Sequence, residues 1–240
     1  MDIHPHKAVI VLADIGGYTR FIAHHDMALV HAEKIITDLL ESVISIAKYP
    51  LSLNKLEGDA ALFFALGDSD APGVVQSALR QASRFFEAFA GKRADLISRT
   101  LCTCSACQGI DRLRIKAIVN FGDIVLKRVR AFEELAGEPV ITAHRLLKNS
   151  AGKEQYILVT DAVEKLSGGL LGAGTAATEN CEGIGPVETV VYDPPAAPLP
   201  PAAPAPLALK LVQLVRLQGY LVLRRLGAFA GRRFPKLAGL

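Results

Sequence analysis

Two apolar strands of this chain each bring one aspartate to a tight, glycine-bearing turn. Residues 8–19 read AVIVLADIGGYT and bring Asp14 to a Gly-Gly turn, and the later segment KLEGDAALFF brings Asp59 to a second turn. Carboxylates suit a divalent cation, and glycine-rich turns let backbone amides approach phosphate oxygens. If both turns face one cleft, these segments predict a site for a metal–nucleotide complex. Taken alone, Asp14 also fits a plain turn residue before two glycines.

Strands and helices predicted from hydrophobic periodicity position these turns. A β-branched run over residues 7–13 predicts a buried strand, and apolar residues at helical spacing predict a helix over residues 27–49 that Pro50 ends. A turn at Gly122-Asp123 is predicted between two later strands. The further predicted strands cover residues 51–57, 60–66, 113–121, 124–129, 155–160 and 187–192, and the further helices cover residues 71–100, 140–147 and 161–166. This order predicts an α+β sandwich, in which helices cover one face of an antiparallel, ferredoxin-like sheet.

The predicted domain covers residues 1–193 and is followed by a linker and a tail. Residues 194–206 hold seven of the thirteen prolines, which predicts an extended, semi-rigid linker. Residues 207–240 interleave apolar residues with seven Lys and Arg and no acidic residue, which predicts a basic amphipathic helical tail. We expect residues 207–236 to lie on an anionic membrane surface; docking on a partner or on a second copy of the chain is the alternative.

Composition and charge narrow the function classes. Outside the tail, acidic residues outnumber basic ones, so a nucleic-acid-binding core is not indicated. The N-terminus lacks the pattern of a secretory signal, and no apolar run approaches the ~20 residues of a membrane span. Four cysteines in a chain of 240 residues do not suggest a disulfide scaffold. These features predict a cytoplasmic protein, located peripherally at the inner face of the membrane if the tail binds lipid.

Three cysteines form a C-x-C-x-x-C pattern in a predicted loop. The thiolates of Cys102, Cys104 and Cys107 could bind Zn²⁺ together with a fourth ligand, such as Cys181 or a histidine. The three alone fall short of a tetrahedral set. A redox pair and no special chemistry are the alternatives.

Four ordered motifs resemble class III adenylate/guanylate cyclase catalytic domains. Asp14 opens DIGGYT, which resembles the motif D-I-x-G-[FY]-T, and the GD of KLEGDA resembles the second metal-bearing hairpin of these domains. Gly122-Asp123 fits their H-S-G-E turn, and GEPVITAHR (residues 137–145) resembles G-x-x-V-N-x-A-x-R. The combination of LEGDA, the cysteine loop and AHRLLKNS is also similar to a bacterial family of uncharacterised cyclase-like proteins. The resemblance spans residues 7–193 and implies the class III cyclase fold.

The resemblance implies a two-metal site for a purine nucleoside triphosphate. In the family's pattern Asp14 and Asp59 would hold two Mg²⁺ or Mn²⁺ ions, one activating the ribose 3′-hydroxyl and the other binding the triphosphate. It also implies that backbone amides of the glycine turn cradle the phosphates. The residues of that turn are Ile15, Gly16, Gly17, Tyr18 and Thr19.

The resemblance also implies roles for three side chains around the substrate. Lys55 falls where adenine-specific members carry a base-reading lysine, and Glu134 is the nearest candidate for its acidic partner. Arg145 matches the arginine that stabilises transition-state charge on the phosphates. Lys55 also fits a solvent-facing strand lysine, and Arg145 fits a surface arginine of a helix. Members of the family act as head-to-tail dimers with shared sites, so the resemblance implies a homodimer.

Two positions depart from the family's pattern. Ile141 replaces the asparagine that orients the ribose, and isoleucine cannot donate a hydrogen bond. Losing a contact of that kind typically lowers the rate about 10²- to 10³-fold. Asp123 puts negative charge where some members carry a phosphate-binding arginine.

Three functional hypotheses follow from these motifs and departures. The first is an enzyme, an adenylate/guanylate cyclase that acts in cyclic-nucleotide signalling. Lys55, at the base-reading position, favours ATP as its substrate. The second is a catalytically degenerate, nucleotide-binding sensor that acts through dimerisation and the tail. The third is a membrane-tethered interaction protein in which the fold is only a scaffold.

Overall fold

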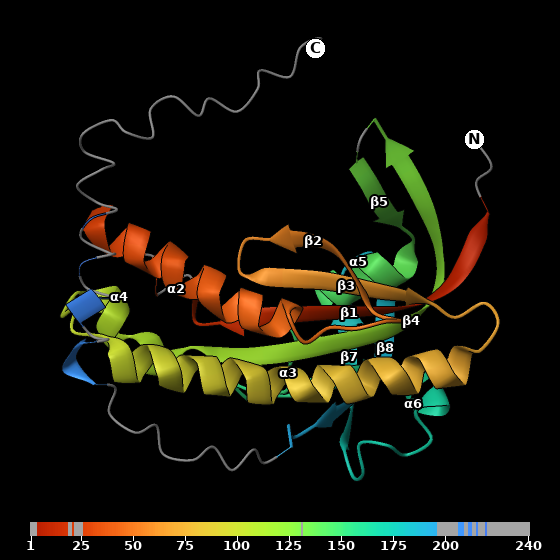
Figure 1. Cartoon of the computed structure of the whole chain (residues 1–240). Helices are drawn as coiled ribbons and strands as arrows, with labels where there is room; N and C mark the ends of the chain where they lie inside the picture. The colour runs from red at the N-terminus through yellow and green to blue at the C-terminus, as the bar shows by residue number, and fades with distance from the viewer. Residues whose placement is uncertain are drawn as a thin grey trace.

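Strand β1 (Pro5–Gly16) is an interior strand of the sheet. It pairs antiparallel with β3 (Ala60–Leu66) on one side and with β4 (Arg114–Val129) on the other (Figure 1). Because both faces of β1 are covered, its apolar run is buried throughout. The computed structural model describes residues 4–18, 21, 26–130, 132–195, 206–208, 211–212, 215 and 219.

The described strands form one sheet in the order β2-β3-β1-β4-β6-β8-β7, with β5 paired to β4. The pair β4–β6 is parallel, and the other described pairs are antiparallel. The remaining strands are β2 (Ser52–Glu57), β5 (Phe132–Ala136), β6 (Ile157–Thr160), β7 (Thr175–Cys181) and β8 (Gly185–Tyr192). The helices are α2 (Asp26–Ile44), α3 (Ala71–Arg99), α4 (Ser105–Gln108), α5 (Glu138–Arg145), α6 (Asp161–Ser167) and the 3-10 helix η1 (Ile110–Arg112).

Helices cover both faces of the sheet. Helices α2 and α3 lie on one face, where Val11 and Phe85 belong to a first buried apolar cluster. Helix α5 packs on the opposite face, where Val140 joins Ile10 in a second cluster. Side chains alternate between the faces of a strand, so Asp14, four residues after Ile10, points to the α5 face.

The predicted α+β class is confirmed by this architecture. The structure adds one parallel strand pair to the predicted antiparallel sheet, and it places α5 on the face opposite α2 and α3. Helix α2 ends at Ile44, five residues before the predicted end. Two strands, β5 and β7, have no counterpart in the sequence prediction; β7 is a largely polar strand at the edge of the sheet, so it lacks a hydrophobic pattern.

The predicted turn at Gly122-Asp123 is wrong, because β4 runs through both residues without a break. A Cβ atom on Gly122 would lie 2.7 Å from Cγ of Pro139 in α5. The glycine therefore permits the close approach of α5 to the strand rather than a chain reversal. Asp123 is exposed and pairs with Lys7 at 2.8 Å, near the start of β1, whereas Asp14 lies near the end of that strand. The structure therefore does not bring Asp123 to Asp14, as a place among the phosphate-binding residues would require.

The linker and the tail fall mostly outside the described residues. Four large apolar residues of the tail are exposed, namely Leu207, Leu211, Val212 and Val215. The prediction of a membrane-binding segment over residues 207–236 concerns mainly residues outside the described part and stays a prediction. Among the helices that the structure describes, none combines the length and apolar character needed to cross a membrane.

Candidate functional site

Asp14 and Asp59 lie next to each other at one end of the β1–β3 ladder. Asp14 pairs across the strands with Ala60, the residue that follows Asp59. The backbone N–H of Ile15 donates to the carbonyl of Asp59 at 3.1 Å, which holds the second turn against the end of β1. The structure thus brings together the two carboxylates that the sequence predicts as metal ligands.

The two carboxyl groups repel each other. Burial raises the pKa of Asp59, and the nearby charge of Asp14 raises it further, to about 6. The ammonium of Lys116 acts against this shift, whereas Glu33 of α2 adds to it. A divalent cation would relieve the repulsion, so the residues present fit a metal ion of the Mg²⁺ or Mn²⁺ type.

Lys116 is a part of this cluster that the sequence analysis does not identify. It lies opposite Asp14 in the β1–β4 register, and its Nζ is 3.1 Å from Oδ2 of Asp14. The same Nζ donates to the carbonyl of Leu147 at 3.0 Å. Lys116 orients the Asp14 carboxylate and supplies a positive charge beside it. A lysine within an otherwise apolar strand is the signal that points to it, because such a charge is rarely buried without a partner.

The substitution Asp59→Asn is expected to stabilise the fold near neutral pH. The pKa of Asp59 in the folded state, about 6, exceeds the usual 3.8, so ionisation of Asp59 destabilises the fold. This destabilisation is absent below about pH 4, where the group is protonated in both states, and reaches its full size above about pH 6. The full shift corresponds to about 3 kcal/mol, which partial solvent exposure reduces to about 1 kcal/mol. We expect Tm to rise by roughly 2–4 °C at about pH 7 and to be unchanged at about pH 4.

Thermal unfolding of the metal-free protein at these two pH values measures this effect. Asp123→Asn is the matched control, because Asp123 is exposed and lies on another part of the sheet. A lower Tm for Asp59→Asn at about pH 7 would contradict the repulsion between the two carboxyl groups.

The glycine turn begins where β1 ends. Gly16 is the last residue of the strand, and Gly17 has φ of +93°, in the left-handed region that favours glycine. Ile15 buries its side chain in the core on the α2–α3 side, so it presents only its backbone to a ligand. Thr19 lies outside the described residues. The phosphate-binding role of the turn stays a prediction.

Tyr18 connects this turn to helix α2. Its hydroxyl donates to Oε1 of Glu33 at 2.9 Å. Burial, followed by this hydrogen bond, raises the pKa of Tyr18 to about 12, so the side chain is a neutral donor at physiological pH. The turn is therefore supported from α2 as well as from the sheet.

The structure brings the predicted base-reading residues together. Nζ of Lys55 is 3.2 Å from Oε2 of Glu134 on β5 and 3.0 Å from Oε1 of Glu57 on its own strand. The hydrogen bond with Glu57 contributes most to a raised pKa of Lys55, against the opposing effect of burial. His144 of α5 joins this network, with Nε2 2.6 Å from Oε2 of Glu57. Burial raises the pKa of Glu57, but its bonds to Lys55 and His144 outweigh burial and lower it overall. The base-reading role itself stays a prediction.

Arg145 and Ile141 are both exposed on α5. Nη1 of Arg145 is 3.3 Å from Oε2 of Glu182, and their side chains are 49% and 86% exposed. An ion pair this exposed contributes little, so Arg145 can exchange Glu182 for another anion. Ile141 is 53% exposed, which leaves an apolar side chain in solvent where the resemblance places a ribose-orienting asparagine.

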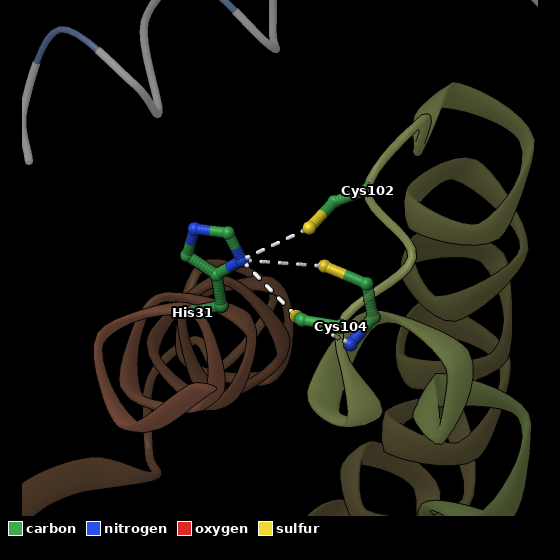
Figure 2. A group of neighbouring side chains, drawn as sticks. His31, Cys102 and Cys104 are labelled. Carbon is green, nitrogen blue, oxygen red and sulfur yellow. Dashed lines mark hydrogen bonds between the residues drawn. The ribbon is translucent and has the colours of Figure 1, made fainter. Parts of the chain in front are cut away.

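The cysteine loop meets a histidine from α2. Single ligand atoms of His31, Cys102, Cys104 and Cys107 all lie within 4.8 Å of one another, so the group could hold a metal ion (Figure 2). Burial lowers the pKa of His31, and burial is also the main cause that raises the pKa of Cys107 to about 12. The sequence leaves Cys181 or a histidine as the fourth ligand, and the structure supplies the histidine. Cys181 instead lies in β7 and belongs to the buried apolar cluster on the α5 face. No local pattern points to His31, because it is far from the loop in sequence.

The fold is that of class III nucleotidyl cyclases. The adenylyl cyclase CyaB from P. aeruginosa matches with a TM-score of 0.63 and 18% identity, covering 83% of this chain and 100% of that chain. The guanylyl cyclase Cya2 matches with a TM-score of 0.63 and 13% identity, covering 85% of this chain and 100% of that chain. A third match is the guanylate cyclase domain of RhGC from Catenaria anguillulae, solved in complex with GTP. It has a TM-score of 0.59 and 18% identity, covering 80% of this chain and 98% of that chain. At these identities the likeness establishes the fold alone.

The chain belongs to the family described as "Protein of unknown function (DUF2652)", which matches residues 36–156. It is also 35% identical over 170 residues to "Uncharacterized protein Rv2561/Rv2562" of Mycobacterium tuberculosis, covering 68% of this chain and 78% of that protein. The family match includes Asp59 and the three clustered cysteines, whereas Asp14 and His31 precede it.

Proposed function

We propose that the protein is a class III nucleotidyl cyclase that converts a purine nucleoside triphosphate, preferentially ATP, into a cyclic mononucleotide and pyrophosphate for signalling. The observation that carries this proposal is the strand register that sets Asp14 beside Asp59 at the end of β1. The fold supports it, since relatives of known structure include adenylyl and guanylyl cyclases. Fold alone does not fix an activity, so the argument depends on the site.

In this proposal Asp14 and Asp59 hold Mg²⁺ or Mn²⁺. Bound there, the metal would activate the ribose 3′-hydroxyl and balance charge on the triphosphate. Asp59 must lose its proton to act as a ligand, so metal affinity falls as the pH drops through about 6. Lys116 orients Asp14, and the backbone from Ile15 through the glycines offers N–H groups to the phosphates.

Lys55, Glu134 and Arg145 would contact the rest of the substrate. The Lys55 ammonium can donate to a ring nitrogen of adenine, and the Glu134 carboxylate can accept from the exocyclic amine. Their existing ion pair keeps both groups in one place. Arg145 would stabilise negative charge on the phosphates during reaction, in place of its exposed contact with Glu182.

A homodimer is part of the proposal. Lys55, Glu57, Glu134 and His144 form a network of ion pairs and hydrogen bonds. The elements around this network expose large apolar side chains, namely Leu53 and Leu56 on β2, Leu126 and Val129 on β4, and Ile141 on α5. These elements are linked to one another by β5 and by the contact between His144 and Glu57. Exposed apolar side chains on linked elements favour an interface, and a second copy of the chain is the occupant that the resemblance implies.

A nucleotide-binding sensor without turnover is the alternative function. The observation that favours it is Ile141, whose exposed side chain has no hydrogen-bonding group for the ribose. Such a sensor would keep the metal–nucleotide site at Asp14 and Asp59 and signal through dimerisation or the tail.

A turnover assay separates the two functions. Full-length protein is incubated with ATP, GTP, CTP or UTP and Mn²⁺, and cyclic mononucleotides are measured by mass spectrometry. We expect cyclic AMP to form fastest and to disappear when the divalent metal is removed with a chelator. The absence of product from all four nucleotides would reject a self-sufficient cyclase and favour the sensor.

A further inference from the structure

We propose that His31, Cys102, Cys104 and Cys107 bind one Zn²⁺ ion, which fastens helix α2 to the connector between α3 and β4. The connector is defined here as residues 100–113. This site lies on the face that carries α2 and α3, shares no residue with the Asp14–Asp59 site, and does not depend on the proposed cyclase activity.

The four side chains converge from two separate parts of the chain. Nδ1 of His31 is 3.3 Å from Sγ of Cys104, 3.5 Å from Sγ of Cys102 and 3.6 Å from Sγ of Cys107. Figure 2 shows the imidazole ring on α2 turned toward the sulfur atoms of the connector. His31 and Cys107 are buried, and the other two cysteines are partly buried.

These distances match those between ligands of one tetrahedral zinc ion. With Zn–S of about 2.3 Å and Zn–N of about 2.05 Å, tetrahedral angles place a nitrogen and a sulfur ligand about 3.6 Å apart. All three observed N···S distances lie at or just below this value. Single-atom ligands within 4.8 Å of one another suit one ion, whereas an iron–sulfur cluster would separate the ligand atoms further.

Hydrogen bonds alone do not explain the arrangement. A neutral imidazole nitrogen has either one proton or one lone pair, so Nδ1 can form a single good hydrogen bond, yet three sulfur atoms surround it. Among the described residues, Nε2 of the same ring is buried and has no partner, so the Nδ1 side accounts for the ring's orientation. The Cys104 sulfur in turn accepts from the backbone N–H of Cys107 at 3.5 Å, which fixes its position in the connector.

The donor set selects zinc on chemical grounds. Three thiolates and one imidazole are soft to borderline ligands, which favour Zn²⁺ over Mg²⁺ or Mn²⁺. Four protein ligands leave no open position, which is typical of structural rather than catalytic zinc.

The ion would support the glycine turn from both sides. The connector packs against Phe21, since a Cβ on Gly109 would lie 3.5 Å from the Phe21 ring, and the Phe21 N–H donates to the carbonyl of Gly17 at 3.1 Å. On the other side, Glu33 lies on α2 two residues after His31 and accepts a hydrogen bond from the Tyr18 hydroxyl. Zinc that joins α2 to the connector would therefore fix the two elements that contact Tyr18 and Phe21.

Metal analysis of the purified full chain tests the proposal. Protein prepared under reducing conditions without added metal is expected to contain about one zinc ion per chain, measured by inductively coupled plasma mass spectrometry. Cys104→Ser is expected to lose most of this zinc, whereas the matched control Cys181→Ser, a buried cysteine outside the group, keeps it. Chelation is expected to lower Tm by roughly 10 °C in the wild type.

A second pair of measurements keeps the test decisive if Cys104→Ser folds poorly. Co²⁺ added to chelated wild-type protein is expected to give thiolate-to-cobalt charge-transfer bands and tetrahedral d–d bands. His31→Cys is expected to retain zinc, because four thiolates also form a tetrahedral site. Wild-type protein that contains no zinc and gives no thiolate–cobalt spectrum would overturn the proposal, and so would iron in place of zinc.

Discussion

Replacing Asp14 with asparagine is expected to lower the rate of cyclic-nucleotide formation by about 10³-fold or more. The amide keeps the size of the side chain and removes its charge, so one of the two metal-binding carboxylates is lost while the end of β1 stays intact. The metal and its charge stabilisation are the largest contribution that the proposed mechanism requires, and losses of this size are typical when one part of such a site is removed. The measurement is the initial rate with ATP at saturating Mn²⁺.

Asp123→Asn is the control for this experiment. It makes the same chemical change on an exposed aspartate of β4 whose partner is Lys7, away from the turn. We expect its rate to stay within a few-fold of the wild type. A rate for Asp14→Asn as high as that of Asp123→Asn would show that the Asp14 carboxylate is not a metal ligand in the reaction.

Replacing Ile141 with asparagine is expected to raise kcat by about 10- to 100-fold. The resemblance to class III cyclases places a ribose-orienting asparagine at this position, and restoring such a polar contact recovers part of the rate that its loss costs. Ile141 is 53% exposed on α5, so the fold tolerates a polar side chain there. A rise in kcat with little change in KM would indicate a contact made mainly in the transition state.

Ile141→Ala distinguishes this effect from the loss of an apolar side chain. Alanine removes the isoleucine without adding a hydrogen-bond donor, so its rate is expected to remain at the wild-type level or below. An equal gain in Ile141→Ala and Ile141→Asn would contradict a ribose-orienting role at this position.

The elements that carry the acidic site follow from local sequence patterns. β1 is a continuous apolar run and the β2–β3 hairpin has its glycine at the tip, so both turns were predictable from residues close together in the chain. β7 was not, because a polar edge strand has little hydrophobic periodicity. The predicted turn at Gly122 is wrong for a different reason. The role of Gly122 depends on Pro139 of another element, and a glycine that permits close packing has the same local pattern as a turn glycine.

The side chains that complete each site depend on long-range pairing. Asp14 and Asp59 stand out because each lies where an apolar strand meets a glycine-bearing turn. Lys116 becomes their neighbour only through the register of β1 with β4, and His31 meets the cysteine loop only when α2 packs beside the connector. Lys116 has a local signal, a charge within an apolar strand, but its position beside Asp14 depends on the β1–β4 register. His31 has no local signal, which is why the sequence predicts three metal ligands of the second site and leaves the fourth open.

Metal-dependent nucleotide binding tests the central claim most directly, because both the cyclase and the sensor require it. A non-hydrolysable ATP analogue is titrated into the full-length protein by calorimetry, with and without Mn²⁺, for the wild type, Asp14→Asn and Asp123→Asn. Our account predicts binding that needs Mn²⁺, persists in Asp123→Asn and is lost in Asp14→Asn. Binding of equal strength without the metal, or in Asp14→Asn, would contradict a metal–nucleotide site at Asp14 and Asp59.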